Sequence, residues 1–160
     1  MRVPFCGILL IFASLLLSAC NSHSESLSLL REAGRIIEIN PDSALLLLDA
    51  IADPGELSEA DHMEYRLRIV QARYKNFIPI SGDTAIFKAR DYFIQKAGNN
   101  WELSFLSYFY CGCVYRENQQ YDLALNEYKQ ALAVAQQHND EAQQAFVLYN
   151  IGDLYFGSAE

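Results

Sequence analysis

The sequence predicts an all-α fold of about seven helices that pack as antiparallel hairpins. Apolar residues recur at helical spacing in one segment after another, and no segment shows the convincing alternation of apolar and polar residues that marks a half-buried strand. Short clusters of Pro, Gly, Asn and Asp separate these segments. Such short connections place consecutive helices antiparallel and side by side.

Proline marks the boundary between the first two expected helices. Apolar residues recur at helical spacing over residues 27–39. Asn40 and Pro41 end this helix and begin the next, because proline is favoured in the first turn of a helix. The second helix, residues 43–51, is strongly apolar, and Pro54 closes it.

A capping signal begins the third expected helix, residues 58–76. Ser58 is a favourable N-cap, and Asp61 stands three residues later, where a capping box has its acid. Pro79 and Gly82 then interrupt the helical pattern. Four further helices are expected after this break, at residues 83–97 (or from 84), 101–117, 121–138 and 141–156.

An apolar run near the N-terminus ends at Leu17-Ser18-Ala19-Cys20 and resembles the lipobox of bacterial lipoproteins. In that family the cysteine is acylated and the signal before it is removed, which implies a signal peptide over residues 1–19. Arg2 precedes the run, which is shorter than the roughly 20 residues of a membrane span. Alternatives are an ordinary secretory peptide and a short N-terminal anchor.

The residues after Cys20 predict how the protein is held at the membrane. Residues 20–28 are rich in serine and are expected to form a tether between the lipid and the fold. Asn21 stands directly after the cysteine, where an aspartate would signal retention away from the outer membrane. The residues that follow lack the clustered acids of a surface-export signal. We therefore expect a lipid-anchored protein of the cell envelope, at the outer membrane and facing the periplasm.

The composition disfavours several kinds of partner. The chain has 160 residues and a net charge of −8, and loss of Arg2 with the signal would make it more acidic. An acidic surface repels nucleic acid and anionic lipid headgroups. No motif for a small-molecule substrate, a cofactor or a metal stands out, since His23, His62 and His138 are scattered.

Two cysteines fall inside an expected helix. Cys111 and Cys113 are two residues apart, so their side chains diverge and a disulfide between them is not expected. We expect both to be small packing residues.

The strongest internal motif resembles the tetratricopeptide repeat, a helix–turn–helix unit of about 34 residues. It covers residues 105–138 and is carried by Tyr108, Cys111, Gly112, Tyr115, Tyr121, Ala124, Leu125, Tyr128 and Ala131. The resemblance implies that Gly112 and Ala124 lie where two helices cross closely, and that Tyr115, Tyr128 and Ala131 face the neighbouring hairpin. Two positions depart from the family pattern. Cys111 stands where the family usually has leucine, and Gln136 stands where proline often ends the repeat.

A second copy of the first-helix pattern follows 40 residues later. Residues 145–160 form an incomplete repeat that is marked by Leu148, Ile151, Gly152 and Tyr155. The resemblance to tetratricopeptide proteins covers most of residues 27–156 and implies a right-handed superhelix of stacked hairpins. The last helix would then leave Leu148, Ile151 and Tyr155 partly uncovered, whereas the end of such a stack normally has a polar outer face.

Two segments of the sequence are similar to tetratricopeptide lipoproteins and to repeat-bearing sensor-regulators of Bacteroidota. Asn40-Pro41-Asp42-Ser43-Ala44 and Tyr149-Asn150-Ile151-Gly152-Asp153-Leu154-Tyr155 carry this likeness. It implies two functions: a membrane-anchored scaffold that holds a partner protein or peptide, or the sensory part of a truncated signal-transduction or transcriptional regulator.

The family resemblance also implies a groove for that partner. Its candidate residues are Phe109, Cys113, Arg116, Tyr149 and Asp153, with Leu106, Glu117, Phe146 and Asn150 at further wall positions. Arg66 and Arg73 share one helical face and either meet an acidic segment or pair with the chain's own carboxylates. Catalytic motifs such as a phosphate loop or His-Glu-x-x-His are missing from the sequence, so no enzyme activity is expected.

Overall fold

The computed structural model describes residues 23–96 and 100–157, which are all-helical and contain no strand. A first helix covers residues 23–36. It is followed by α2 (Pro41–Asp49), the 3-10 turn η1 (Pro54–Glu56), α3 (Glu59–Lys75), α4 (Ala85–Lys96), α5 (Trp101–Glu117), α6 (Tyr121–Gln137) and α7 (Glu141–Gly157). The all-α prediction is therefore confirmed for this part of the chain. The expected signal peptide and Cys20 lie outside the described residues.

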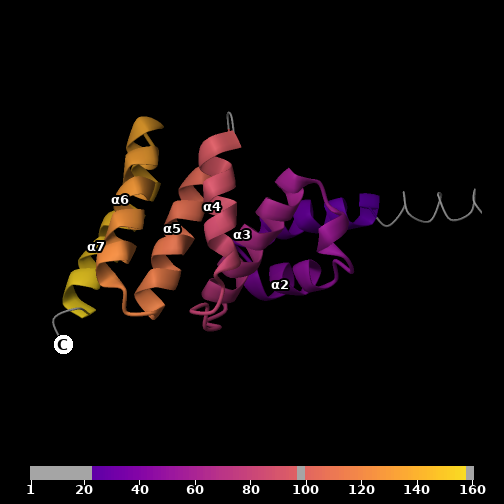
Figure 1. Cartoon of the computed structure of the whole chain (residues 1–160), viewed down its shortest axis with the longest axis horizontal. Helices are drawn as coiled ribbons and strands as arrows, with labels where there is room; N and C mark the ends of the chain where they lie inside the picture. Colours follow the sequence, from indigo (N-terminus) through magenta and orange to yellow (C-terminus); the bar gives the residue numbers. More distant parts are fainter. Residues whose placement is uncertain (1–22, 97–99, 158–160) are drawn as a thin grey trace, which may run out of the picture.

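Helices α4 to α7 stand side by side along the long axis of the molecule, and the first helix and α2 lie at the other end of it (Figure 1). From α2 to α7, each helix packs against the next one, and α3 also contacts α5. The connections after α3, α5 and α6 turn through residues with positive φ, Phe77 at 56°, Gln119 at 58° and Asn139 at 56°. Paired backbone hydrogen bonds close these turns, as where Gln120 N–H donates to the Tyr115 carbonyl at 2.9 Å.

Side-chain caps fix the starts of several helices, and the cap at Ser58 was predicted from the sequence. Asn40 Oδ1 accepts from Ser43 N–H at 3.1 Å, and Ser58 Oγ accepts from Asp61 N–H at 3.2 Å. Asn100 Oδ1 accepts from Leu103 N–H at 3.3 Å. Each cap satisfies a backbone donor that the first helical turn leaves without an intrahelical partner.

The first helix begins earlier than the sequence pattern predicted. Residues 23–28, most of the expected tether, are already helical, so the serine-rich segment does not form a separate linker there. Leu27 of this segment, and Leu29 directly after it, pack against the core cluster that contains Leu30. Their apolar contacts extend the helix across residues whose composition alone suggests a coil. The second helix starts at Pro41, as the favoured place of proline in the first turn predicted.

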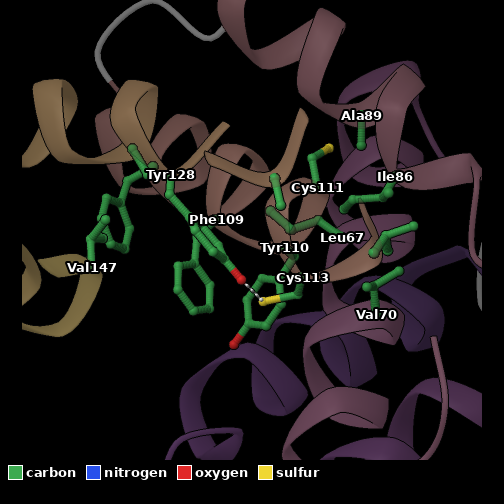
Figure 2. Packing of buried hydrophobic residues seen from close by; sticks show 14 of the residues in the cluster. Leu67, Val70, Ile86, Ala89, Phe109, Tyr110, Cys111, Cys113, Tyr128 and Val147 are labelled. Carbon is green, nitrogen blue, oxygen red and sulfur yellow. Dashed lines mark hydrogen bonds between the residues drawn. The ribbon is translucent and has the colours of Figure 1, made fainter. Parts of the chain in front are cut away.

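Two apolar cores run through the row of helices. The first is formed by the first helix, α2, the segment after η1 and α3, through Leu30, Ala33, Ile37, Ala44, Leu48, Ile51, Leu57 and Ala72. The second extends from α3 to α7 and contains Leu67, Phe105, Phe109 and Tyr128 among its large side chains (Figure 2). In each core the buried residues come from helices that are adjacent in the row.

Polar interactions between residues 37 positions apart recur along the chain. They join Glu38 to Lys75, Ile80 to Glu117, Ser81 to Asn118, Arg90 to Glu127, Arg116 to Asp153, and Glu59 to Lys96. The last of these pairs closes the α3–α4 hairpin, whereas the other pairs connect one hairpin to the next. The same separation therefore recurs in five polar contacts between neighbouring hairpins.

The residues of the strongest repeat lie at the contacts between these helices. Ala124, Tyr128 and Ala131 of α6 are fully buried. Tyr128 packs against Gly112 inside its own hairpin, which corrects the expectation that it faces the neighbouring one. Tyr115 does reach the preceding hairpin, because its ring stacks on Phe87 of α4 with centroids 4.8 Å apart.

The matching residues of α7 are placed differently. Gly152 has no atom within 4 Å of the position that a β-carbon would occupy, and Tyr155 is 59% exposed. No described helix follows α7, so Gly152 has no counterpart of Tyr128 beside it.

Candidate functional site

Arg116 of α5 connects three helices on one side of the row. Its Nη2 donates to the Tyr74 hydroxyl of α3 at 2.8 Å, and its Nη1 lies 3.1 Å from Asp153 Oδ2 of α7. The guanidinium also lies 5.9 Å from the centroid of the Tyr74 ring. Arg116 and Asp153, both predicted groove residues, are therefore direct partners.

Two other predicted groove residues do not reach the surface. Phe109 is 1% exposed and Cys113 is completely buried, so neither can line a groove. The Phe109 ring is surrounded by Tyr74, Tyr110, Tyr128 and Phe146. Cys113 accepts a hydrogen bond from the Tyr128 hydroxyl, with the donor oxygen 3.5 Å from Sγ (Figure 2). The expectation for these two positions is corrected, because aromatic rings from adjacent helices cover them.

The groove residues of α7 are mostly accessible. Tyr149 is 74% exposed and Phe146 is 44% exposed, and the Phe146 ring still touches Phe109, with centroids 4.7 Å apart. Asn150 is buried and donates to the Phe146 carbonyl at 2.8 Å. Because Phe146, Tyr149 and Asp153 are three, four and seven residues apart, they share one helical face.

Arg66 and Arg73 of α3 each have a partner within the chain. Arg73 Nη1 lies 2.8 Å from Asp83 Oδ1, which agrees with the alternative in which the chain's own carboxylates neutralise it. Arg66 Nε donates to His62 Nε2 at 3.1 Å. The pKa of His62 is lowered, first by burial and then by the nearby Arg66 charge.

An exposed apolar segment beside Arg116 was missed by the sequence reasoning. Phe77 is 96% exposed and has a φ of 56°, an unusual backbone conformation for a bulky residue. It lines a pocket of about 570 Å³ together with Tyr74, Ile78, Pro79, Ser81, Arg116 and Glu117. The Phe-Ile-Pro run between two helices was the available signal, but it was interpreted only as a helix breaker.

We call the surface formed by Tyr74, Phe77, Ile78, Arg116, Phe146, Tyr149 and Asp153 the odd-helix surface, since its residues come from α3, α5, α7 and the turn after α3. It combines exposed aromatic and aliphatic side chains with the Arg116–Asp153 ion pair. Leu106 lies apart from this surface, in a smaller pocket of about 230 Å³ lined from the first helix, α3, α5 and α7.

The buried titratable groups favour neutral, unreactive forms. Burial raises the pKa of the Cys113 thiol to about 11, and that of Cys111 is raised further by burial and by Glu127. Both cysteines are free, and within the described ranges no three His, Cys, Asp or Glu side chains converge as a metal site would need. Thiols held in this state are poor nucleophiles.

Glu127 is a buried carboxylate that pairs with Arg90 of α4. Burial raises its pKa although the Arg90 charge acts in the opposite direction. Its Oε2 atom has no hydrogen-bond partner. This pair lies between helices α4 and α6 and holds the two hairpins in register.

Searches against protein-family models, curated proteins and solved structures find no match to this chain. Among residues 23–96 and 100–157, none of the helices combines the length and the apolarity needed to cross a bilayer. Inferences about function therefore rest on the sequence and on the surfaces described above.

Proposed function

We propose that this protein is a membrane-anchored scaffold that binds a partner protein through the odd-helix surface. The observation that carries the proposal is the exposure of Phe77, Ile78, Phe146 and Tyr149 around the Arg116–Asp153 pair. Aromatic residues and arginine are enriched where proteins bind each other, because they bury large apolar areas and supply directed polar contacts. An extended or helical peptide segment is the kind of ligand that such a surface fits.

The regular 37-residue separation of the inter-helix pairs supports a tetratricopeptide-like stack. In such a stack one helix of each hairpin contributes to a continuous binding wall. The tight Gly112–Tyr128 contact supports the same assignment, since it places a glycine at the crossing of two antiparallel helices.

The lipobox supports the anchor. We propose that Cys20 is acylated after removal of residues 1–19, and that the helical domain faces the periplasm from the outer membrane. Metabolic labelling with a palmitate analogue tests this directly: the label is expected on the native protein and lost from a Cys20→Ala variant. A label that persists on Cys20→Ala contradicts the proposed anchor.

Capture of a partner from membranes tests the scaffold. The native protein is compared with a Phe77→Ala, Tyr149→Ala variant and with Leu46→Ala, which removes a side chain that is 70% exposed on α2. Circular dichroism establishes that all three are folded. We expect a crosslinked partner with the native protein and with Leu46→Ala only. Equal capture by all three proteins would overturn the assignment of the odd-helix surface.

A further inference from the structure

A pocket of about 230 Å³ is lined by the end of the first helix, by α3 and α5, and by the start of α7. The first helix lies at one end of the molecule and α7 at the other, so the pocket extends across α3 and α5 (Figure 1). Pockets for drug-sized ligands usually have volumes of about 300–1,000 Å³, so this pocket fits a smaller molecule. None of the exposed aromatic residues of the odd-helix surface lines it.

A buried arginine forms one side of the pocket. The Arg68 side chain is 13% exposed, and its Nε lies 3.3 Å from the position that a β-carbon on Gly34 would occupy. Its Nε and Nη2 donate to Glu64 Oε1 at 3.3 and 3.2 Å, and its Nη1 donates to Gln71 Oε1 at 2.9 Å. A guanidinium has five N–H groups, so one on each Nη has no partner in the described part of the chain. These two donors are available to a ligand.

A buried glutamine holds this side of the pocket in place. Gln71 is 1% exposed, although glutamine is usually found at protein surfaces. Its Oε1 accepts from Arg68, and its Nε2 donates to Glu38 Oε1 at 2.8 Å. Glu38 Oε2 in turn accepts from Lys75 Nζ at 2.7 Å. The arginine side of the pocket is therefore fixed by hydrogen bonds before any ligand arrives.

Two carboxylates line the other side, at the starts of α5 and α7. Asp140 Oδ1 accepts from Gln143 N–H at 3.0 Å and so caps α7, which leaves Oδ2 for another donor. Neither Asp140 nor Glu102 forms an ion pair within residues 23–96 and 100–157. The start of a helix carries roughly half a positive charge, so a full carboxylate at each one leaves an excess of negative charge. Since the ion pairs on the arginine side add no net charge, the pocket attracts a cationic group.

Apolar side chains of α5 complete the pocket. Trp101 lies next to Glu102, and one turn further along the helix are Phe105 and Leu106. The indole of Trp101 stacks on the His138 ring, with centroids 4.6 Å apart and planes inclined by 11°, which holds it in one orientation. Trp101 is the only tryptophan of the sequence, so the tryptophan fluorescence of the protein reports on this pocket.

We propose that this pocket binds a small zwitterion, an amino acid or a dipeptide, whose carboxylate accepts from Arg68 and whose ammonium group lies at Glu102 and Asp140. Its apolar side chain packs against Trp101 and Leu106. A carboxylate accepts two N–H groups of a guanidinium in a fixed geometry, which satisfies both donors that Arg68 leaves unused. A ligand with an ammonium group alone would leave these donors unpaired, and one with a carboxylate alone would enter a pocket that is already negative. This site is separate from the odd-helix surface.

Titrations with leucine and alanyl-leucine, followed by tryptophan fluorescence and calorimetry, test the proposal. We expect at least one of them to bind and to change the emission of Trp101, and the tighter one identifies the length of ligand that the pocket accepts. Acetylation of the amine of that ligand, or conversion of its carboxylate to an amide, removes one charged group. Each change should weaken binding at least about tenfold, because a charged group of the protein loses its partner.

Two variants assign the two ends of the ligand. Glu102→Gln with Asp140→Asn removes both carboxylates, while asparagine keeps the helix cap. It should weaken binding of the zwitterion at least about tenfold and change little for the acetylated ligand, which has no ammonium group. Arg68→Lys keeps the charge but loses the paired donors, so it should weaken binding of the zwitterion and not of the amide. Circular dichroism establishes that the variants are folded.

Asp122→Asn with Glu141→Gln is the matched control. It also removes two acids from the first turns of helices, but these acids do not line the pocket. This variant should bind the zwitterion as the native protein does. The Phe77→Ala, Tyr149→Ala variant should do the same, so the proposed scaffold stands or fails separately.

Three results would overturn the proposal. The first is that neither zwitterion binds at up to about 10 mM, as for a pocket that holds only water. The second is that the amide binds as tightly as the zwitterion, as for a site that accepts any cation. The third is that Glu102→Gln with Asp140→Asn binds the zwitterion as tightly as the native protein, which would place the ligand elsewhere.

Discussion

The ring of Tyr128 fills the space beside Gly112 so closely that a β-carbon on residue 112 would lie 2.4 Å from Cε1 of the ring. Real β-carbons essentially never make contacts shorter than 3.0 Å. Tyr128 is itself completely buried and contacts Phe109 as well, with ring centroids 5.4 Å apart (Figure 2). It has little freedom to move, so this contact sets the distance between α5 and α6.

We expect Gly112→Ala to lower the free energy of unfolding by about 1–3 kcal/mol, the usual effect of overpacking a core. Gly152→Ala is the matched control, since it makes the same change on a helix with open space around it. It should raise stability by up to about 1 kcal/mol, because alanine is the better helix former. Urea denaturation of both variants measures the difference. Equal effects at the two positions would show that residue 112 is not at a tight crossing.

The buried Glu127 should make stability depend on pH. Its pKa is higher in the folded chain than the ordinary value of 4.5, chiefly because of burial. The other ionisable groups whose charges interact with it or its partner are Arg90, Asp91, Tyr108 and Cys111. A raised carboxyl pKa contributes stability that is complete below the unfolded pKa and is lost as the pH rises through the folded pKa.

The free energy of unfolding of the native protein, relative to Glu127→Gln, is therefore expected to increase as the pH falls from 7 toward 4.5. Denaturant midpoints for both proteins across this range provide the measurement. A relative stability that falls over the same range would mean that the Arg90 charge outweighs burial.

Cys111 and Cys113 should resist alkylation in the folded protein. Both side chains are completely buried and their thiol pKa values are raised, so little thiolate forms near neutral pH. Treatment with iodoacetamide at pH 8, followed by peptide mapping, should show these cysteines labelled only after denaturant is added. Rapid labelling without denaturant would indicate that α5 separates easily from its neighbours.

Phe77 combines high exposure with a backbone conformation that glycine adopts at much lower cost. Phe77→Gly should therefore raise the free energy of unfolding by about 1 kcal/mol, and it removes an aromatic ring from the proposed binding surface. Phe77→Ala removes the ring without relieving the backbone and should leave stability nearly unchanged. We expect both variants to lose partner binding and only Phe77→Gly to gain stability. This result would assign binding to the Phe77 ring and the stability difference to the backbone of the turn.

The number and order of the helices could be predicted because capping residues and short breakers mark their ends. Ser58, Asn40 and Asn100 act as N-caps in the structure, and Pro41 begins α2. The start of the first helix could not be predicted from composition, since contacts of Leu27 and Leu29 with distant residues extend it into a serine-rich segment.

The binding surface was less predictable, because helical periodicity does not show how many neighbours a helix has. In α5 the residues from Phe109 to Val114 are all buried, since other helices pack around most of its circumference. A pattern on one helix cannot distinguish a side chain that faces solvent, as Tyr149 does, from one that faces another helix, as Phe109 does. Phe77 lies in a turn, where periodicity carries no information.

Site-specific photo-crosslinking in native membranes tests the proposed scaffold most directly. A photoreactive amino acid is placed at Phe77 or Tyr149 on the odd-helix surface, or at Leu46 or Ile94, which are 70% and 48% exposed on α2 and α4. The proposed function predicts that positions 77 and 149 crosslink to the same partner protein and that positions 46 and 94 do not. Crosslinks of equal yield at all four positions, or none at 77 and 149, would contradict it.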